Sequence, residues 1–88
     1  MEADPYVIKS FYGVAIKKID FGYNFFGVLS YENILYYMTI PLITQYITNG
    51  TKITRENFTK IPNITDFSAK NKKLIIQNTH NKLLFVDD

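Results

Sequence analysis

The chain has 88 residues, enough for one domain with a single modest core, and no cysteine, which excludes disulfide bonds and thiolate metal sites. Its net charge at pH 7 is only +2, and the lone histidine, His80, cannot build a metal site by itself, so we expect neither a metal nor another cofactor. Hydrophobic residues make up 47% of the chain and aromatic residues 16%, a composition that favours strands and leaves apolar surface for a partner.

The N-terminal part predicts a short helix followed by a β-hairpin. The apolar residues at positions 7, 8 and 11 have helical spacing behind Pro5, so we expect one or two helical turns over residues 5–11. A strand over residues 14–19, a turn at 20–22 and a second strand over 23–30 follow. Gly27 lies inside that second strand, where glycine indicates a forced bend of the sheet or the close approach of another backbone.

The apolar run over residues 34–47 permits two interpretations. Six of its members fit a helical stripe: Ile34, Leu35, Met38, Leu42, Ile43 and Ile47. Pro41 argues against an unbroken helix, so we prefer a strand over 34–40, with Pro41 at a bulge or edge and extended chain after it. The pair Asn49-Gly50 then predicts a turn, and the polar residues 51–72 predict a long excursion.

Positive charge concentrates in residues 50–73. The cations there are Lys52, Arg55, Lys60, Lys70, Lys72 and Lys73, against the two carboxylates Glu56 and Asp66. Any attraction to phosphate should therefore be strongest in this segment. The alternative is an ordinary solvated loop.

Two short apolar runs, residues 74–76 and 83–86, predict a closing β-hairpin. With them the chain has a short N-terminal helix and five strands, and the longest insertion lies between the third and fourth strands. The sequence therefore predicts a single domain over residues 1–88 of the all-β class, folded as a small, strongly bent, five-stranded open barrel.

Residues 22–29, Gly-Tyr-Asn-Phe-Phe-Gly-Val-Leu, resemble the first motif of the Sm/LSm family, which has a glycine turn, an aromatic residue, a glycine and a hydrophobic pair. Residues 74–78 and 83–86 are similar to the second motif. Residues 5–13 look like the helix and its exit in the F-type Sm subunit, and the G-type subunit is nearly as close. The resemblance implies the Sm-like fold and a place beside other Sm/LSm subunits in a seven-membered ring.

The resemblance also implies RNA contacts, at positions where this chain departs from the family. Glu32 or Asn33 stands for the family's Asp, and correspondingly Tyr36 or Tyr37 stands for its base-reading Asn. Gln77-Asn78 replaces an Arg-Gly pair. The implied positions for uridine-rich single-stranded RNA are Leu35, Tyr36, Tyr37, Gln77 and Asn78. Since a tyrosine keeps a stacking face but has fewer hydrogen-bonding groups than an asparagine, we expect weak and poorly specific contact.

Ring assembly follows from the free edges of an open barrel, because unpaired strand edges can pair with another chain. In the family the fourth strand of one subunit pairs with the fifth of the next. The implied interface residues are Leu74, Ile75, Ile76, Leu83, Leu84, Phe85 and Val86. Residues 83–86 are the candidate edge, and the alternative is an ordinary interior strand.

The leading hypothesis is a subunit of a heteromeric Sm/LSm ring, an snRNP core component in pre-mRNA splicing, located in the nucleus or in both nucleus and cytoplasm. It would contribute ring assembly more than base-specific RNA contact. The alternatives are a degenerate Sm-like protein-interaction module that does not bind RNA and a small viral or plasmid-encoded inhibitor. We expect no enzyme, since no nucleophile–base spacing is present, and no membrane protein, since no apolar run approaches about 18 residues.

Overall fold

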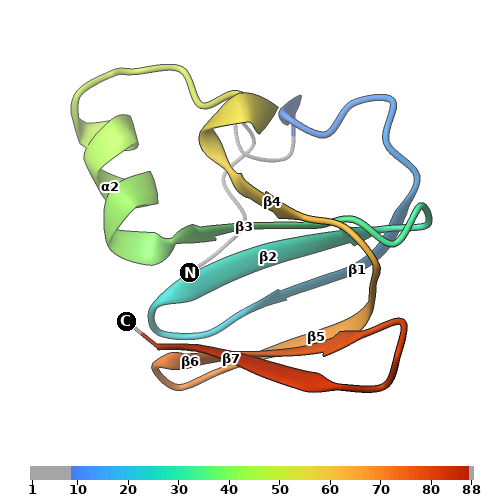
Figure 1. The fold of residues 1–88 in the computed structure, drawn as a ribbon. Helices are drawn as coiled ribbons and strands as arrows, with labels where there is room; N and C mark the ends of the chain where they lie inside the picture. The colour runs from blue at the N-terminus through green and yellow to red at the C-terminus, as the bar shows by residue number, and fades with distance from the viewer. Residues whose placement is uncertain (1–8, 88) are drawn as a thin grey trace.

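The computed structural model describes residues 9–87, which form two antiparallel sheets and one α-helix (Figure 1). The strands of the first sheet are, in spatial order, β1 (Ile16–Phe21), β2 (Phe25–Ser30), β3 (Leu35–Thr39) and β4 (Thr59–Ile61). Those of the second are β5 (Ile64–Lys70), β6 (Lys73–Asn78) and β7 (Leu83–Asp87). The helix α2 (Ile40–Thr48) and the 3-10 turn η1 (Arg55–Asn57) lie between β3 and β4. This small, mostly-β architecture fits the predicted all-β class, although the two sheets of the described chain do not form a closed barrel.

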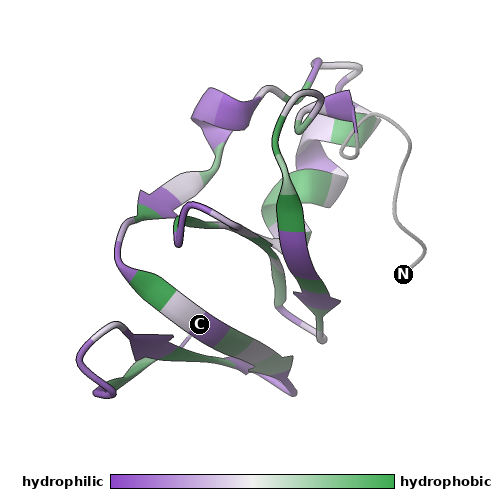
Figure 2. Ribbon diagram, turned by 90° about the vertical axis from the view of Figure 1, so that its right-hand side faces the viewer, coloured by the Kyte–Doolittle hydropathy of each residue, from purple (hydrophilic) through white to green (hydrophobic). Residues whose placement is uncertain are grey.

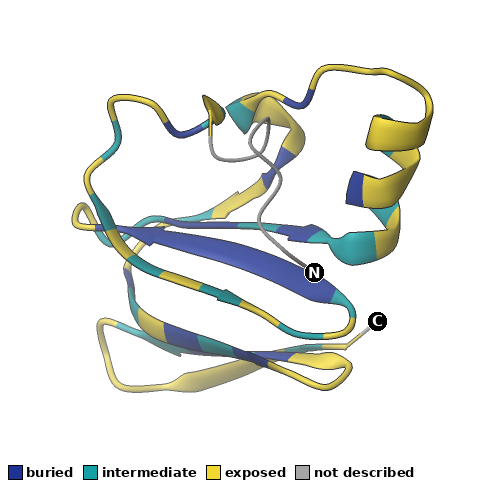
Figure 3. Cartoon of the chain, turned by 180° about the vertical axis from the view of Figure 1, so that it is seen from behind, coloured by how far each residue is buried: buried dark blue, intermediate teal, exposed yellow. Residues whose placement is uncertain are grey.

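The two sheets lie one above the other (Figure 2). Two strands of the first sheet, β2 and β3, contribute residues to both hydrophobic clusters. Phe26 and Val28 point into a cluster that also contains Ile43 of α2. Phe25 and Leu29, on the other face of β2, point into the cluster between the sheets. Figure 3 accordingly shows β2 as buried along its whole length.

Gly27 of β2 faces Phe67 of β5 in the second sheet. A Cβ atom placed on Gly27 would be 2.6 Å from a ring carbon of Phe67 on β5, much closer than real Cβ atoms approach other atoms. The glycine therefore leaves room for an aromatic side chain. The sequence predicted a bend or a neighbouring backbone, and the approaching group is instead a ring.

The two predicted hairpins are present with small shifts. β1 begins two residues later than predicted and continues to Phe21, so its turn to β2 lies at residues 22–24 rather than 20–22. The closing hairpin of β6 and β7 is confirmed, and its strands are antiparallel neighbours. The predicted N-terminal helix falls mostly on residues 1–8, outside the described residues.

The prediction of extended chain after Pro41 is wrong, because residues 40–48 form α2. Pro41 lies in the first turn of this helix, where a missing N–H removes no intrahelical hydrogen bond. The helical stripe was thus the correct interpretation for the second half of the run. The turn at Asn49-Gly50 is confirmed: Asn49 is the C-cap, and Gly50 takes a φ of +68°.

The prediction of a long irregular excursion over residues 51–72 is also wrong. This segment contains η1, β4 and β5, so the described chain has seven strands where five were expected. The pairing register of β5 shifts between Ile64 and Asp66. This bulge places the buried residues Ile64 and Phe67 three positions apart, which hides the alternation typical of a strand.

Candidate functional site

β7 is an edge strand that exposes large apolar side chains to solvent. It pairs only with β6 within the described chain. Three consecutive residues are largely open to solvent: Leu83 is 57% exposed, Leu84 45% and Phe85 60%. Figure 3 shows most of this strand as exposed, in contrast to β2. A consecutive apolar stretch on a free edge is typical of a site that pairs with another chain.

The backbone of β7 also has hydrogen-bonding groups that point away from its neighbour. The Asn78 N–H donates to the Lys82 carbonyl at 3.0 Å, which fixes these two residues as a hydrogen-bonded pair across the hairpin. Hydrogen-bonded and non-hydrogen-bonded pairs alternate along an antiparallel ladder. The N–H and C=O groups of Leu83, Phe85 and Asp87 therefore point outward, to a side where no described strand lies.

The opposite edge of the second sheet, along β5, is closed by side chains. The Lys18 Nζ donates to the Phe67 carbonyl at 2.6 Å, and the Lys17 Nζ donates to the Thr65 carbonyl at 3.4 Å. The Ala69 N–H donates to Asp20 Oδ2 at 2.9 Å. The strand that supplies all three side chains, β1, lies next to β5 but forms no backbone ladder with it. The second sheet therefore has one closed edge and one open edge.

An ion pair between the two sheets supports this closure. Lys18 Nζ lies 3.0 Å from Asp66 Oδ1, and the same oxygen accepts the Phe67 N–H at 2.8 Å. The hydrogen bond from Lys18 lowers the pKa of Asp66 below its ordinary value, with a smaller contribution from the Phe67 N–H. The carboxylate is thus held in its charged form.

The residues predicted for RNA contact do not come together on one surface. Leu35 is fully buried between the sheets, and Tyr36 is only 6% exposed in the cluster beside α2. Tyr37 is half-buried, as are Gln77 and Asn78 on β6. The Asn78 Oδ1 accepts the backbone N–H groups of His80 and Lys82, so this side chain shapes the β6–β7 turn.

The predicted interface residues divide between core and surface. Leu74 and Ile76 are fully buried between the sheets, whereas Ile75 and Val86 are half-buried. The exposed members are the three β7 residues Leu83, Leu84 and Phe85. The exposed part of the predicted interface is therefore on β7 alone, the strand that contains the predicted edge, residues 83–86.

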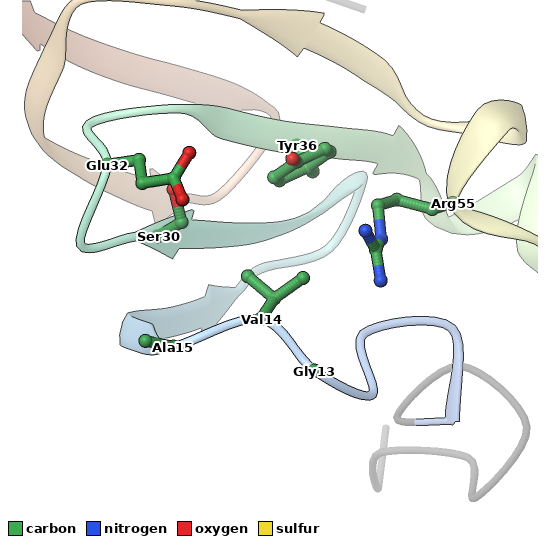
Figure 4. Close-up of a pocket in the computed structure, with 7 residues that line it drawn as sticks. All are labelled: Gly13, Val14, Ala15, Ser30, Glu32, Tyr36 and Arg55. Atoms are coloured by element: carbon green, nitrogen blue, oxygen red, sulfur yellow. The ribbon is translucent and has the colours of Figure 1, made fainter.

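Two pockets of the described chain have Arg55 in their lining. A pocket of about 160 Å³ lies between Ser30, Glu32, Tyr36 and Arg55 (Figure 4). This volume is below the range of about 300–1,000 Å³ that is usual for small-molecule sites. Arg55 is also engaged, because its Nε and Nη2 donate to the carbonyls of Ser10 and Tyr12. A larger hollow of about 500 Å³ lies between residues 9–12 and 52–56.

No family model, no curated protein and no solved structure matches this chain. Within residues 9–87, no helix is long and apolar enough to cross a membrane. In the same range, no three histidine, aspartate or glutamate side chains gather as a metal site.

The positively charged residues divide into separate groups, one of which adjoins an exposed aromatic residue. The Tyr23 N–H donates to the Asn71 carbonyl at 3.1 Å, which joins the β1–β2 turn to the β5–β6 turn. Tyr23 is 78% exposed, and Lys70, Lys72 and Lys73 on the neighbouring turn are exposed as well. The charge of this group is evident in the sequence but its aromatic neighbour is not, because residues 23 and 71 are brought together only by the fold.

Proposed function

We propose that this chain is a non-catalytic assembly subunit that joins another protein chain through β7. The observation that carries the proposal is the asymmetry of the second sheet, whose β5 edge is closed by Lys17, Lys18 and Asp20 while its β7 edge is open. In pairing of this kind the main-chain hydrogen bonds supply affinity, and the flanking side chains supply specificity. The exposed Leu83, Leu84 and Phe85 are suited to the second role.

Photo-crosslinking tests the proposal. A benzophenone amino acid replaces Phe85 in the chain expressed in its native cells, and the matched control carries it at Tyr23, which is more exposed but lies on a turn. We expect a defined protein adduct from position 85 and none from position 23. If position 85 gives no protein adduct in a folded variant, the proposal is wrong.

RNA contact within an Sm/LSm ring is a second candidate function, favoured by the group of Tyr23, Lys70, Lys72 and Lys73. An exposed aromatic ring gives a stacking face to an unpaired base, and neighbouring lysines attract the phosphates. The Sm/LSm resemblance supports the same role for the chain, in nuclear RNA metabolism with uridine-rich RNA. It implies contacts at Leu35, Tyr36, Tyr37, Gln77 and Asn78 instead, and Asn78 lies at the opposite end of the sheets, where the β2–β3 turn carries the exposed Tyr31.

Two tyrosines distinguish the alternatives for RNA. Tyr31 is 67% exposed in the β2–β3 turn, and Tyr23 is 78% exposed in the β1–β2 turn. We expect Tyr23→Ala to weaken binding of a uridine-rich oligonucleotide by about 1–3 kcal/mol, as for other stacked bases, and Tyr31→Ala to leave it unchanged. A reversed result would favour the end of the sheets where the β2–β3 turn and Asn78 lie. No binding by the wild-type chain or its complex would favour an assembly module that does not contact RNA.

A further inference from the structure

The open edge of β7 limits how a partner strand can pair with it. Only Leu83, Phe85 and Asp87 direct their N–H and C=O groups outward, so a partner strand must place its own outward-pointing residues opposite these three. A second β7 that runs antiparallel can do this if the two strands are aligned with Phe85 at the centre. Phe85 then lies opposite Phe85, and Leu83 lies opposite Asp87 at each end.

From this match we infer that the chain that occupies β7 is a second copy of the same protein, paired antiparallel about a twofold axis at Phe85. The inference rests on the proposed assembly function, to which it adds the identity of the partner. Each of the three facing pairs can exchange both of its backbone hydrogen bonds. A register centred on Leu84 would use fewer of these groups, because it places Asp87 opposite Asn81, which has a φ of +63° in the turn.

The side chains on both faces of the strand suit this register. On the outer face the two Phe85 rings meet beside Ile75, which is directly paired with Phe85 on β6. On the inner face Leu84 lies opposite Val86 of the second copy, and Val86 already packs against the cluster between the sheets. Self-pairing thus extends both faces with apolar contacts and covers Leu84 and Phe85, which the single chain leaves 45% and 60% exposed.

The charges at the ends of the strand favour the antiparallel direction. Lys82 precedes β7 and Asp87 is its last residue, and both are exposed. In the Phe85-centred antiparallel pair, the end of one strand that follows Lys82 meets the end of the other strand that carries Asp87, so opposite charges lie at the same end. Parallel pairing would instead place lysine beside lysine and aspartate beside aspartate, which is unfavourable.

Cysteine crosslinking tests both the partner and the register, since the chain has no cysteine of its own. In the Phe85-centred pair, Cα atoms at position 85 would be about 5.5 Å apart, within the range for a disulfide. Position 84 would face position 86 of the second copy, with its own counterpart about 7–8 Å away. Under mild oxidation we expect Phe85→Cys to form a disulfide-linked dimer and Leu84→Cys to form little. Ile19→Cys, 45% exposed on β1, is the matched surface control.

Sedimentation of the wild-type protein should show a concentration-dependent dimer that Phe85→Lys abolishes and Tyr23→Lys does not. A monomer at all concentrations, or equal crosslinking of all three cysteine variants, would overturn self-pairing. The in-cell photo-crosslink at position 85 separates this failure from failure of the assembly function. An adduct of twice the 10.3 kDa chain mass supports pairing with a second copy. An adduct of another mass supports the assembly function but overturns self-pairing. The absence of any adduct overturns both proposals.

Discussion

Gly27 controls how closely the two sheets approach. Because a Cβ there would lie 2.6 Å from the Phe67 ring, Gly27→Ala forces the ring or the sheet to move. We expect the free energy of unfolding to fall by about 1–3 kcal/mol, as in other overpacked cores. Urea denaturation measures this change.

The same contact can be verified with a double-mutant cycle. Phe67→Leu removes the ring edge that meets position 27, so Gly27→Ala should cost less in the Phe67→Leu background than in the wild type. Gly50→Ala is the control: position 50 has a φ of +68°, and a Cβ there would meet no atom within 4 Å, so its cost should not change with residue 67. Additive effects of Gly27→Ala and Phe67→Leu would contradict the steric explanation.

The lowered pKa of Asp66 makes part of the stability depend on pH. Its folded-state pKa lies below the ordinary value of 3.8, so the unfolded chain binds more protons in acid. The contribution is fully present well above pH 3.8 and is lost as the pH falls through the folded-state pKa. Because Lys18 and Asp66 are 40% and 59% exposed, we expect less than about 1 kcal/mol.

Asp66→Asn tests this pH dependence, since the amide oxygen can still accept the Phe67 N–H. In urea titrations at a series of pH values, the variant should be slightly less stable than the wild type near neutrality and should approach it in acid. A constant difference between the two proteins across this range would show that charge on residue 66 is not the cause.

At the scale of the elements, β1 and β5 are joined by hydrogen bonds from β1 side chains to β5 backbone groups, and not by backbone–backbone hydrogen bonds. Asp20→Ala leaves the N–H of Ala69, a residue only 5% exposed, without its acceptor. We expect a loss of about 1–3 kcal/mol and faster hydrogen exchange at the Ala69 amide, measured by NMR. Lys17→Ala should change stability by less than about 0.5 kcal/mol, because its hydrogen bond is long and exposed. Equal effects of the two substitutions would contradict the assigned role of Asp20.

The strands that could be predicted from sequence are those with an apolar run between clear turn residues. β2 and the β6–β7 hairpin have continuous apolar runs bounded by turn residues, and both are present. α2 was missed because Pro41 was interpreted as breaking a helix, although a proline is well suited to a first helical turn. β5 was missed because the bulge after Ile64 disrupts its alternation.

The candidate site could be predicted only in part, because some of its features depend on contacts between residues far apart in the sequence. Residues 83–86 were identified as an edge from their composition and position, and β7 is an edge strand. The closure of the opposite edge could not be found, because Lys18 and Asp20 contact residues 48 or more positions away. The burial of Leu35 and Tyr36 was likewise hidden, because it depends on how both sheets and α2 cover β3.

At the scale of the whole molecule, β2 joins two cores that lie on its opposite faces. Ile43 belongs to the cluster beside α2, and Ile76 belongs to the cluster between the sheets. Because both clusters depend on the same strand, we expect a single unfolding transition. Ile43→Val and Ile76→Val should each lower the stability by about 0.5–1.5 kcal/mol.

Two probes should then report the same transition in both variants: far-UV circular dichroism, and the fluorescence of the seven tyrosines in this tryptophan-free chain. If Ile43→Val shifted only the helical signal, the cluster beside α2 would be an independent folding unit.

The closed β5 edge leaves the second sheet with one edge, β7, through which it can be extended. When two copies join through β7, the combined sheet has three strands from each copy and ends at both sides in a β5 edge that is already closed. Growth of this sheet therefore stops at two molecules. In such a dimer Lys18 and Asp20 would block further strand addition, and the second sheet of a chain without them would have two open edges and could extend into a filament.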